Sequence, residues 1–267
     1  MNSIIRSTKN YKMFEVHDMN RSVYPETESF KNLVASMKKH GFIDAIPLHC
    51  VSNGGGKLKI KGGHHRFLAA QEAGVPVKYV VSKDTASIYE LERSGPGKWK
   101  MKGFFDSFCK QGLNDYVAVQ DYVEETGIGL NNALSMFYGH SAGSGNFTKD
   151  GRFQTGQFTI NSYEHPRVVG DIVLFLKSLG VDWADKDPMV KAISRVVWLE
   201  EFDVERFTKK ADKHTHLFCK QRGVDAYLQL IETVYNHGSP AKKKVNIAFL
   251  AKEAAAERMN RQHIKKT

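Results

Sequence analysis

The sequence feature that most constrains the fold is a glycine pair inside residues 59–70, between a segment of alternating polarity and an apolar helical segment. Gly62 and Gly63 let the backbone turn sharply and approach a ligand closely. The helix expected after them points unpaired N–H groups at that place, which favours an anion. His65 and Arg66 add side-chain donors, and an arginine can hold a phosphate through two parallel hydrogen bonds. The segment therefore predicts a phosphate-binding turn.

The segments around this turn predict a small domain of mixed α and β structure. Apolar residues repeat at helical spacing from Phe30 to Met37, and Gly41 stands where a helix commonly ends. Two strand-like segments flank the glycine-rich turn at residues 52–56, so a hairpin is expected there. In chain order, the pattern predicts a strand over residues 11–16, a helix over 30–40, strands over 43–51 and 57–61, a helix over 67–73 and a strand over 76–81.

From residue 86 onward the pattern is mainly helical. Ser, Gly and Pro at residues 94–97 are typical of a linker, and residues 152–160 alternate as a strand or hairpin does. The predicted helices cover residues 104–110, 116–125, 130–138, 168–179, 189–201, 204–210, 224–235 and 247–259.

A glycine-containing turn at residues 126–129 joins two short helices, which is the pattern of a helix-turn-helix. We therefore expect an α+β chain of three parts: a mixed-sheet domain over residues 1–85, a helical segment with the helix-turn-helix over 86–140, and a mainly helical region over 141–267.

The charge balance favours a polyanionic partner. The chain has a net charge of +10 and a pI near 9.3, and three lysines follow one another at residues 242–244. Nucleic acid is the leading candidate for such a protein, so DNA is an expected partner. The three cysteines are odd in number and far apart, which argues against a disulfide framework or a zinc site.

The apolar runs are too short for a membrane protein. None approaches the roughly 20 residues that a bilayer span needs. The first six residues also lack the apolar core of a secretory signal. We expect a cytoplasmic protein with no membrane partner.

Around the glycine pair the chain resembles the ParB/sulfiredoxin superfamily, over about residues 10–82. The resemblance is carried by Asn20-Arg21 after the first strand, by the helix that ends in Gly41-Phe42-Ile43, and by residues 62–70 with Gly74-Val75-Pro76-Val77 after them. It implies a small mixed-sheet domain that binds a nucleotide, in a protein of the phage or plasmid type that can form a homodimer.

The resemblance implies several chemistries on one fold. ParB proteins bind and hydrolyse CTP with Mg²⁺ while they clamp DNA, and sulfiredoxins use ATP to repair oxidised cysteine. Other relatives include free serine kinases and proteins described as nucleases. The fold alone therefore does not decide the function.

Residue by residue, the resemblance implies that the nucleotide contacts Gly62, Gly63, His64, His65 and Arg66, with Asn20 and Arg21 closing the opposite side. His64 stands where sulfiredoxins carry their catalytic cysteine, which argues against sulfiredoxin activity. Glu90 and Glu92 are similar to the acidic ParB segment that helps to hold nucleotide and metal, so they are the candidates for Mg²⁺. That segment lacks the usual asparagine, so both CTP and ATP remain candidate cofactors.

Four functions stay open at this stage. The leading one is a nucleotide-binding, DNA-associated ParB-like protein that holds or hydrolyses its nucleotide. The second is an ATP- or ADP-dependent phosphotransferase for a small molecule, with Glu15 or Asp18 as base. The third is a nuclease in which His64, His65 and a metal activate water, although neighbouring histidines on a helix are expected to point apart. The fourth is a DNA-binding or scaffolding protein whose glycine turn holds no ligand. The candidate catalytic residues are Glu15, Asp18, Glu90, Glu92 and His65.

Overall fold

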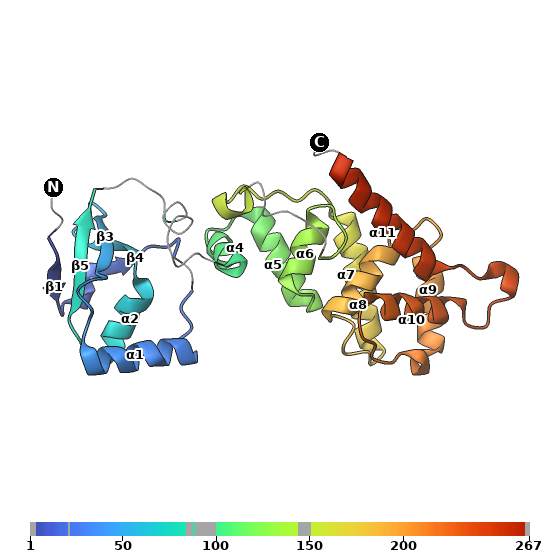
Figure 1. The fold of residues 1–267 in the computed structure, drawn as a ribbon, viewed down its shortest axis with the longest axis horizontal. Coiled ribbons are helices and arrows are strands. Elements are labelled where there is room, and N and C mark those ends of the chain that lie inside the picture. The colour runs from blue at the N-terminus through green and yellow to red at the C-terminus, as the bar shows by residue number, and fades with distance from the viewer. Residues whose placement is uncertain (1–3, 21, 84–87, 89–99, 144–150, 265–267) are drawn as a thin grey trace. The chain divides into compact units, whose positions relative to one another are not determined.

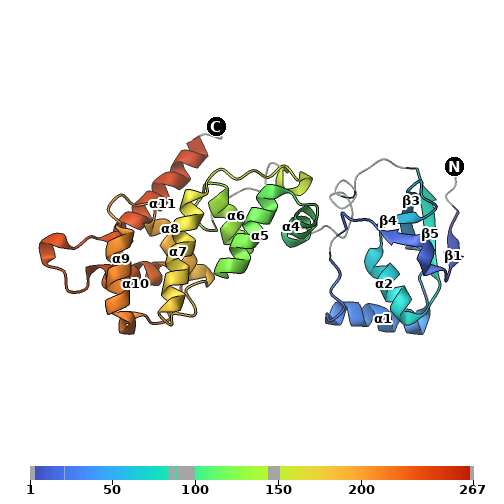
Figure 2. The same cartoon turned by 180° about the vertical axis from the view of Figure 1, so that it is seen from behind.

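The computed structural model describes residues 4–20, 22–83, 88, 100–143 and 151–264, with side chains up to residue 257. The chain divides into two compact units, which Figures 1 and 2 show from opposite sides. Unit 1 contains residues 1–113 and 154–156, and unit 2 contains residues 114–153 and 157–267. The three-part division with boundaries at 85/86 and 140/141 stays a prediction.

Unit 1 contains a mixed five-stranded sheet with the order β1-β5-β3-β4-β2. The β1/β5 and β3/β4 pairs are antiparallel, whereas the β3/β5 and β2/β4 pairs are parallel. The predicted hairpin is confirmed, because β3 and β4 pair with Cys50 opposite Ile60. The strands are β1 (Arg6–Thr8), β2 (Phe14–Val16), β3 (Leu48–Ser52), β4 (Leu58–Gly62) and β5 (Val77–Ser82).

Two helices of unit 1, α1 (Glu28–His40) and α2 (His64–Ala73), pack against each other on the same side of this sheet (Figures 1 and 2). Phe30 of α1 and Phe67 of α2 are buried together with Leu48 of the sheet, so the core lies between the sheet and the helix pair. A further helix, α4 (Met101–Lys110), belongs to the same unit. A mixed sheet with helices on one side, followed by a helical region, confirms the α+β fold.

Several predicted boundaries in unit 1 were wrong. Strand β1 was missed, since three polar residues carry no alternation. The strand expected over residues 43–51 begins only at Leu48, because the Ile46 N–H bonds to the Ile43 carbonyl in a turn. The predicted strand over residues 11–16 is a 3-10 turn followed by β2. Helix α2 begins at His64 rather than at residue 67, so the His-His-Arg sequence is its first turn.

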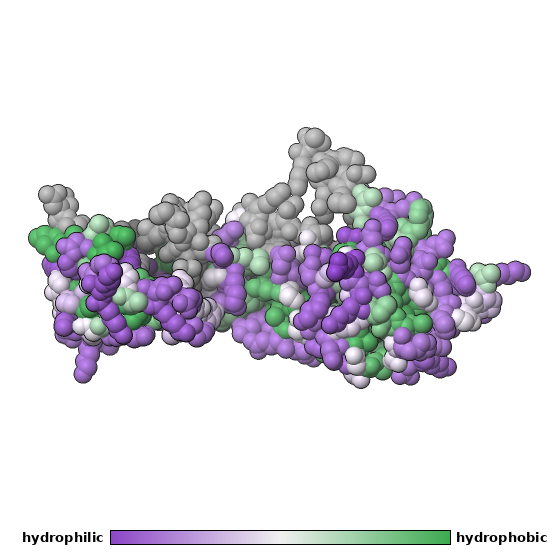
Figure 3. Space-filling model, turned by 60° about the horizontal axis from the view of Figure 1, so that its bottom comes forward, coloured by the Kyte–Doolittle hydropathy of each residue, from purple (hydrophilic) through white to green (hydrophobic). Residues whose placement is uncertain are grey.

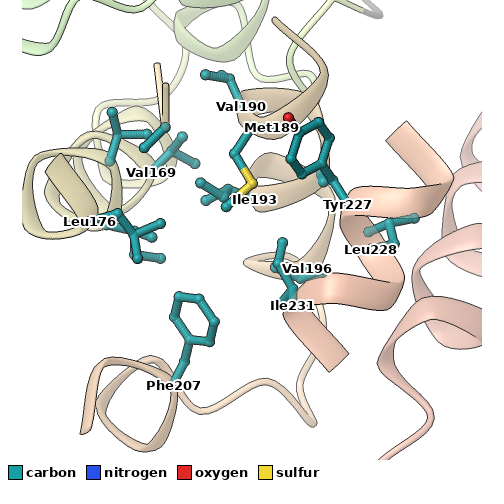
Figure 4. Packing of buried hydrophobic residues seen from close by; sticks show 14 of the residues in the cluster. Val169, Leu176, Met189, Val190, Ile193, Val196, Phe207, Tyr227, Leu228 and Ile231 are labelled. Carbon is teal, nitrogen blue, oxygen red and sulfur yellow. The ribbon is translucent and has the colours of Figure 1, made fainter. Parts of the chain in front are cut away.

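Unit 2 is helical throughout its described part. Its core is formed by apolar side chains of α7, α8, α9 and α10, and Figure 4 shows Ile193, Phe207 and Ile231 facing one another there. The helices of unit 2 are α5 (Asn114–Thr126), α6 (Leu130–Phe137), α7 (Glu164–Ser178), α8 (Asp187–Val196), α9 (Val204–Lys213), α10 (Val224–Asn236) and α11 (Ile247–Ile264).

The structure describes all of residues 152–160, and the strand or hairpin expected there is absent. A single 3-10 turn, Phe153–Thr155, occupies it. Phe153 and Phe158 both pack on Tyr116, with ring centroids 5.6 Å from it, and the Tyr116 hydroxyl donates to the Phe153 carbonyl over 2.8 Å. The alternation therefore comes from two phenylalanines that share one aromatic partner.

The surface of the described residues is mainly hydrophilic in the view of Figure 3, with smaller hydrophobic areas between the polar side chains. Within the described ranges, no helix combines the length and the apolar character that crossing a bilayer requires.

Candidate functional site

The predicted glycine turn lies at the junction of β4 and α2. Gly63 has a φ of +92° and is the residue before the first turn of α2. A Cβ atom at this position would lie 2.8 Å from Arg66 Nη2 and 3.0 Å from Leu48 Cδ2. The backbone conformation therefore favours glycine, and a Cβ would also require the Arg66 guanidinium and Leu48 to shift. Gly62 is less restricted, since its Cβ would lie 3.4 Å from that of His49.

The first turn of α2 has no carboxylate of its own to balance the positive end of the helix. The helix has no side-chain cap and no acidic residue in its first turn. Its first N–H groups have no carbonyl partners within the helix, and the helix dipole adds a partial positive charge at the same end. An anion at this position would satisfy these N–H groups and balance the dipole.

Arg66 adds a full positive charge at the same place. Its guanidinium lies over Gly63, its Nη1 donates to the Ile46 carbonyl, and its Cζ is 6.0 Å from the centroid of the Phe42 ring. Burial lowers the pKa of Arg66, but an arginine keeps its charge at neutral pH. The segment after α1 thus fixes the orientation of this cation.

The two histidines of the first turn have different surroundings. His64 is buried, whereas His65 is half-buried and lines a cavity. Their ring centroids are 4.4 Å apart, so the expectation that the rings would point apart is wrong. Among the described residues, no group of three His, Cys, Asp or Glu side chains has the arrangement of a metal site.

The loop after β2 brings Asn20 to the strand that leads into the turn. Asn20 is buried, and its Nδ2 donates to the Ile60 carbonyl over 2.8 Å. Its Oδ1 is also buried and has no hydrogen-bond partner within the described residues. In the same loop, burial lowers the pKa of His17, and the charge of Lys59 lowers it further. Asn20 therefore lies beside Ile60 of β4, which is two residues before Gly62. Arg21 lies outside the described residues.

The predicted carboxylates are not all brought to the turn. Glu15 pairs in register with Lys59, about 13 Å of strand before Gly63, and it accepts a hydrogen bond from Asn53 in the hairpin turn. Asp18 is exposed and lies 3.5 Å from the Lys59 ammonium. Glu15 therefore lies toward the far end of β4. Glu90 and Glu92 lie outside the described residues.

A cavity of about 350 Å³ opens beside His65. Asp106 in its wall accepts hydrogen bonds from the Tyr24 hydroxyl and the Lys102 ammonium, each over 3.2 Å. The sequence did not lead us to predict this cavity, although the four hydroxyl residues between positions 22 and 29 indicate a polar surface. The lining residues are Ser22, Tyr24, Thr27, Ser29, Phe30, Leu33, His65, Lys100, Lys102, Gly103 and Asp106.

Taken together, the turn and the cavity offer donors and cations rather than a nucleophile. The turn offers the α2 N–H groups and Arg66, and the cavity offers hydroxyls with Lys100 and Lys102; His65 belongs to both. Such a set of groups suits the phosphates and the sugar hydroxyls of a nucleotide.

Comparison with known families matches residues 8–92 to the ParB N-terminal domain. The match contains the strands β2 to β5, α1, α2 and the whole glycine turn. No curated protein matches the chain significantly. The first part of the chain is therefore a ParB-like N-terminal domain, as its resemblance implied.

Proposed function

We propose that the ParB-like N-terminal domain binds a nucleoside triphosphate, CTP or ATP, together with Mg²⁺, and that the protein associates with DNA. The observation that carries the proposal is the start of α2. Gly63 exposes the helix N-terminus, no carboxylate compensates it, and Arg66 places a second positive group over the same residue. Each of these features would be stabilised by a bound phosphate.

The residues present fit a triphosphate. Its phosphates would lie on Gly62, Gly63 and the α2 N-terminus, with Arg66 and His65 as side-chain donors. Asn20 Oδ1, buried beside β4, is an acceptor, so it would take a hydrogen bond from a ribose hydroxyl or a base amino group rather than contact a phosphate. The cavity next to His65 has hydroxyl and lysine side chains for the remaining part of the nucleotide.

Mg²⁺ usually binds one or two carboxylates together with phosphate oxygens and water. We assign these carboxylates to Glu90 or Glu92, as the family resemblance implies, and Asp106 supplies a further carboxylate in the cavity wall. The ion would neutralise phosphate charge. The protein's own groups orient the nucleotide through the α2 N–H groups and the guanidinium of Arg66.

DNA association is supported by two features outside the nucleotide site. The chain has a net charge of +10. In unit 2, α5 and α6 are joined by the short turn 127–129 and pack against each other, as the helices of a helix-turn-helix do. Residues 132–137 of α6 are buried, so we assign the DNA contact of this pair to the exposed side of α5.

Isothermal titration of the full chain with CTP, ATP and GTP, with and without Mg²⁺, tests the nucleotide proposal. We expect one nucleotide to bind, and Arg66→Lys to weaken it at least tenfold, because lysine keeps the charge but loses the two-pronged geometry. Lys38→Gln, an exposed position on α1, is the control and should bind as the wild type does. Failure of all three nucleotides to bind would contradict the proposal.

Phosphate release measured with and without duplex DNA separates a hydrolase from a protein that only holds its nucleotide. Release that depends on an added small-molecule acceptor and ignores DNA would support the phosphotransferase instead. Circular dichroism of Arg66→Lys shows whether lost binding reflects lost folding, since Arg66 also bonds to the Ile46 carbonyl.

A further inference from the structure

Helix α9 in unit 2 presents a basic stripe to solvent. Its four cations are spaced i, i+3, i+4 and i+7, which places them on one face of the helix. The opposite face is used by the core, where Phe207 and Ala211 are buried. The stripe borders a hollow of about 330 Å³ lined by Arg206, Lys209, Lys210, Lys213, Asp203 and Glu205.

The segment after α10 is held against this stripe. Arg206 Nη2 donates to the Ser239 hydroxyl over 3.3 Å and to the Lys243 carbonyl over 3.0 Å, and its guanidinium lies 4.1 Å from the centroid of the Tyr235 ring. Lys210 Nζ donates to the His237 carbonyl over 2.6 Å. These contacts bring the exposed lysines of residues 242–244 beside α9.

Three histidines meet at the end of the stripe. The ring centroids of His214 and His237 are 4.2 Å apart, and His216 lies 5.9 Å and 6.5 Å from them. Desolvation lowers the pKa of His214, and the positive charges of its neighbours His237, His216, Lys210 and Lys213 lower it further. The carboxylates near this group are Asp203 and Glu205, which line the hollow with Lys210, and Glu232, which lines another with His237.

We propose that this basic surface, formed by Arg206, Lys209, Lys210, Lys213 and the lysines 242–244, binds the phosphate backbone of duplex DNA, and that His214, in contact with His237 at its end, strengthens the binding at acidic pH. The proposal rests on the DNA association proposed above. It adds a contact surface that is separate from α5 and α6 and from the nucleotide site.

The geometry favours a nucleic-acid backbone over a lipid surface. The stripe spans eight residues, from Arg206 to Lys213, and about 10 Å of helix. Each strand of duplex DNA carries one charge per about 3.4 Å of the axis, so this length faces about three phosphates of one strand. A helix that lies in a membrane needs an exposed apolar face, whereas Phe207 and Ala211 are already used by the core of unit 2.

His214 adds charge only when the pH falls, because its pKa lies below the usual value of an imidazole. At pH 7.5 it is therefore neutral. As the pH falls, it gains a proton more readily when phosphates lie nearby, because the bound polyanion offsets the desolvation of the imidazole and the repulsion from Lys210 and Lys213. Binding of DNA and protonation are therefore linked, and acid strengthens both.

Fluorescence anisotropy of the full chain with a labelled 30-base-pair duplex of mixed sequence, measured across salt concentrations, tests the surface. Each phosphate contact contributes about 0.9 to the slope of log K against log salt, so Lys209→Gln, Lys213→Gln and Lys243→Gln together should reduce its magnitude by about 2 to 3. All three lysines are exposed, so the variant should fold.

A variant with Lys31→Gln, Lys38→Gln and Lys39→Gln, all exposed on α1, removes the same charge from unit 1 and should leave the slope within about 1 of the wild type. An equal loss in both variants would show that net charge alone matters and would overturn the proposal. If poly-glutamate of the same chain charge competes as well as unlabelled duplex, the partner is an acidic protein and the proposal also fails. A wild type without any affinity for DNA would instead remove the DNA association on which the proposal rests.

The histidines are tested by the same titration at pH 5.5 and 7.5. We expect the wild type to bind several-fold more tightly at pH 5.5, and a variant with His214→Gln and His237→Gln to lose most of this gain while it keeps its affinity at pH 7.5. A pH dependence that is unchanged in the variant would overturn the role of the histidines.

Discussion

Helices α2 and α9 begin in opposite ways. At α9, the carboxylate of Asp203 accepts a hydrogen bond from the Arg206 N–H over 3.0 Å, and Glu205 follows in the first turn. At α2, Gly63 offers no side chain, the first turn has no acid, and Arg66 adds a positive group. The chain thus neutralises the start of α9 with its own carboxylates. The first turn of α2 has no such carboxylate, which supports the anion site that we propose there.

The largest effect is expected for Gly63→Ala. The left-handed conformation costs a non-glycine residue about 1 kcal/mol, and the new Cβ must also displace Arg66 and Leu48, so we expect a loss of about 2 kcal/mol in the free energy of unfolding. Gly74→Ala at the other end of α2 is the control, since Gly74 has a φ of +70° but no atom within 4 Å of its Cβ position. Urea denaturation followed by circular dichroism measures both. Equal losses would show that the space around Gly63 is not restricted.

Asp203→Ala should cost about 1 kcal/mol in the free energy of unfolding, because the helix loses its cap and the Arg206 N–H loses its acceptor. Asp203→Asn keeps an acceptor and should cost only a few tenths of this. The fluorescence of Trp183 and Trp198, both in unit 2, reports the urea midpoint. If the alanine variant is as stable as the wild type, α9 does not depend on its own carboxylate and the contrast with α2 fails.

Thr27→Ala tests whether a side-chain cap distinguishes single helices, α9 from α2, or distinguishes unit 2 from unit 1. Thr27 caps α1 in unit 1, but its hydroxyl lies 3.4 Å from the Phe30 N–H, longer than the bond at α9. We expect a cost of about 0.5 kcal/mol, at the low end for such caps. Thermal unfolding followed by circular dichroism measures it. A cost above that of Asp203→Ala would contradict the ranking by bond length.

An effect no larger than that of Thr27→Ala is expected for His65→Glu, which gives the first turn of α2 the carboxylate that it lacks. A negative charge in the first turn should stabilise the domain by about 0.5 kcal/mol at low salt, and the gain should shrink in 1 M salt. The same charge should repel a triphosphate and weaken its binding. His65→Gln is the neutral control. A destabilised glutamate variant at low salt would show that the start of α2 is not positive in the protein.

The helices and the glycine turn could be predicted because their signals are local. Phe30 to Met37 repeat at the helical period, and Gly62-Gly63 need only their neighbours to form a turn. Strand β1 could not be predicted in this way, because Arg6 to Thr8 become a strand only by pairing with β5. The alternation over residues 152–160 was misleading for a similar reason, since Tyr116 gathers both phenylalanines from a distant helix.

The candidate site also combines residues that the sequence indicated with contacts that only the tertiary fold creates. The glycines, His65 and Arg66 were found from the sequence. The contacts that orient Arg66, to the Ile46 carbonyl and the Phe42 ring, join residues about 20 positions apart and follow from the tertiary fold. Glu15 stays a predicted base of the phosphotransferase alternative, and the parallel register with β4, which the sequence does not show, places it beside Lys59.

The order of the strands also bears on how the two units fold. β1 at residues 6–8 pairs with β5 at residues 77–82, and β2 and β3 reach their parallel partners over long stretches of chain. The sheet therefore cannot be completed until the last of its strands has been synthesised, whereas consecutive helices such as α5 and α6 meet soon after they form. Because non-local pairing slows folding, we expect the sheet of unit 1 to acquire its native hydrogen bonds after the helices of unit 2 in refolding from denaturant.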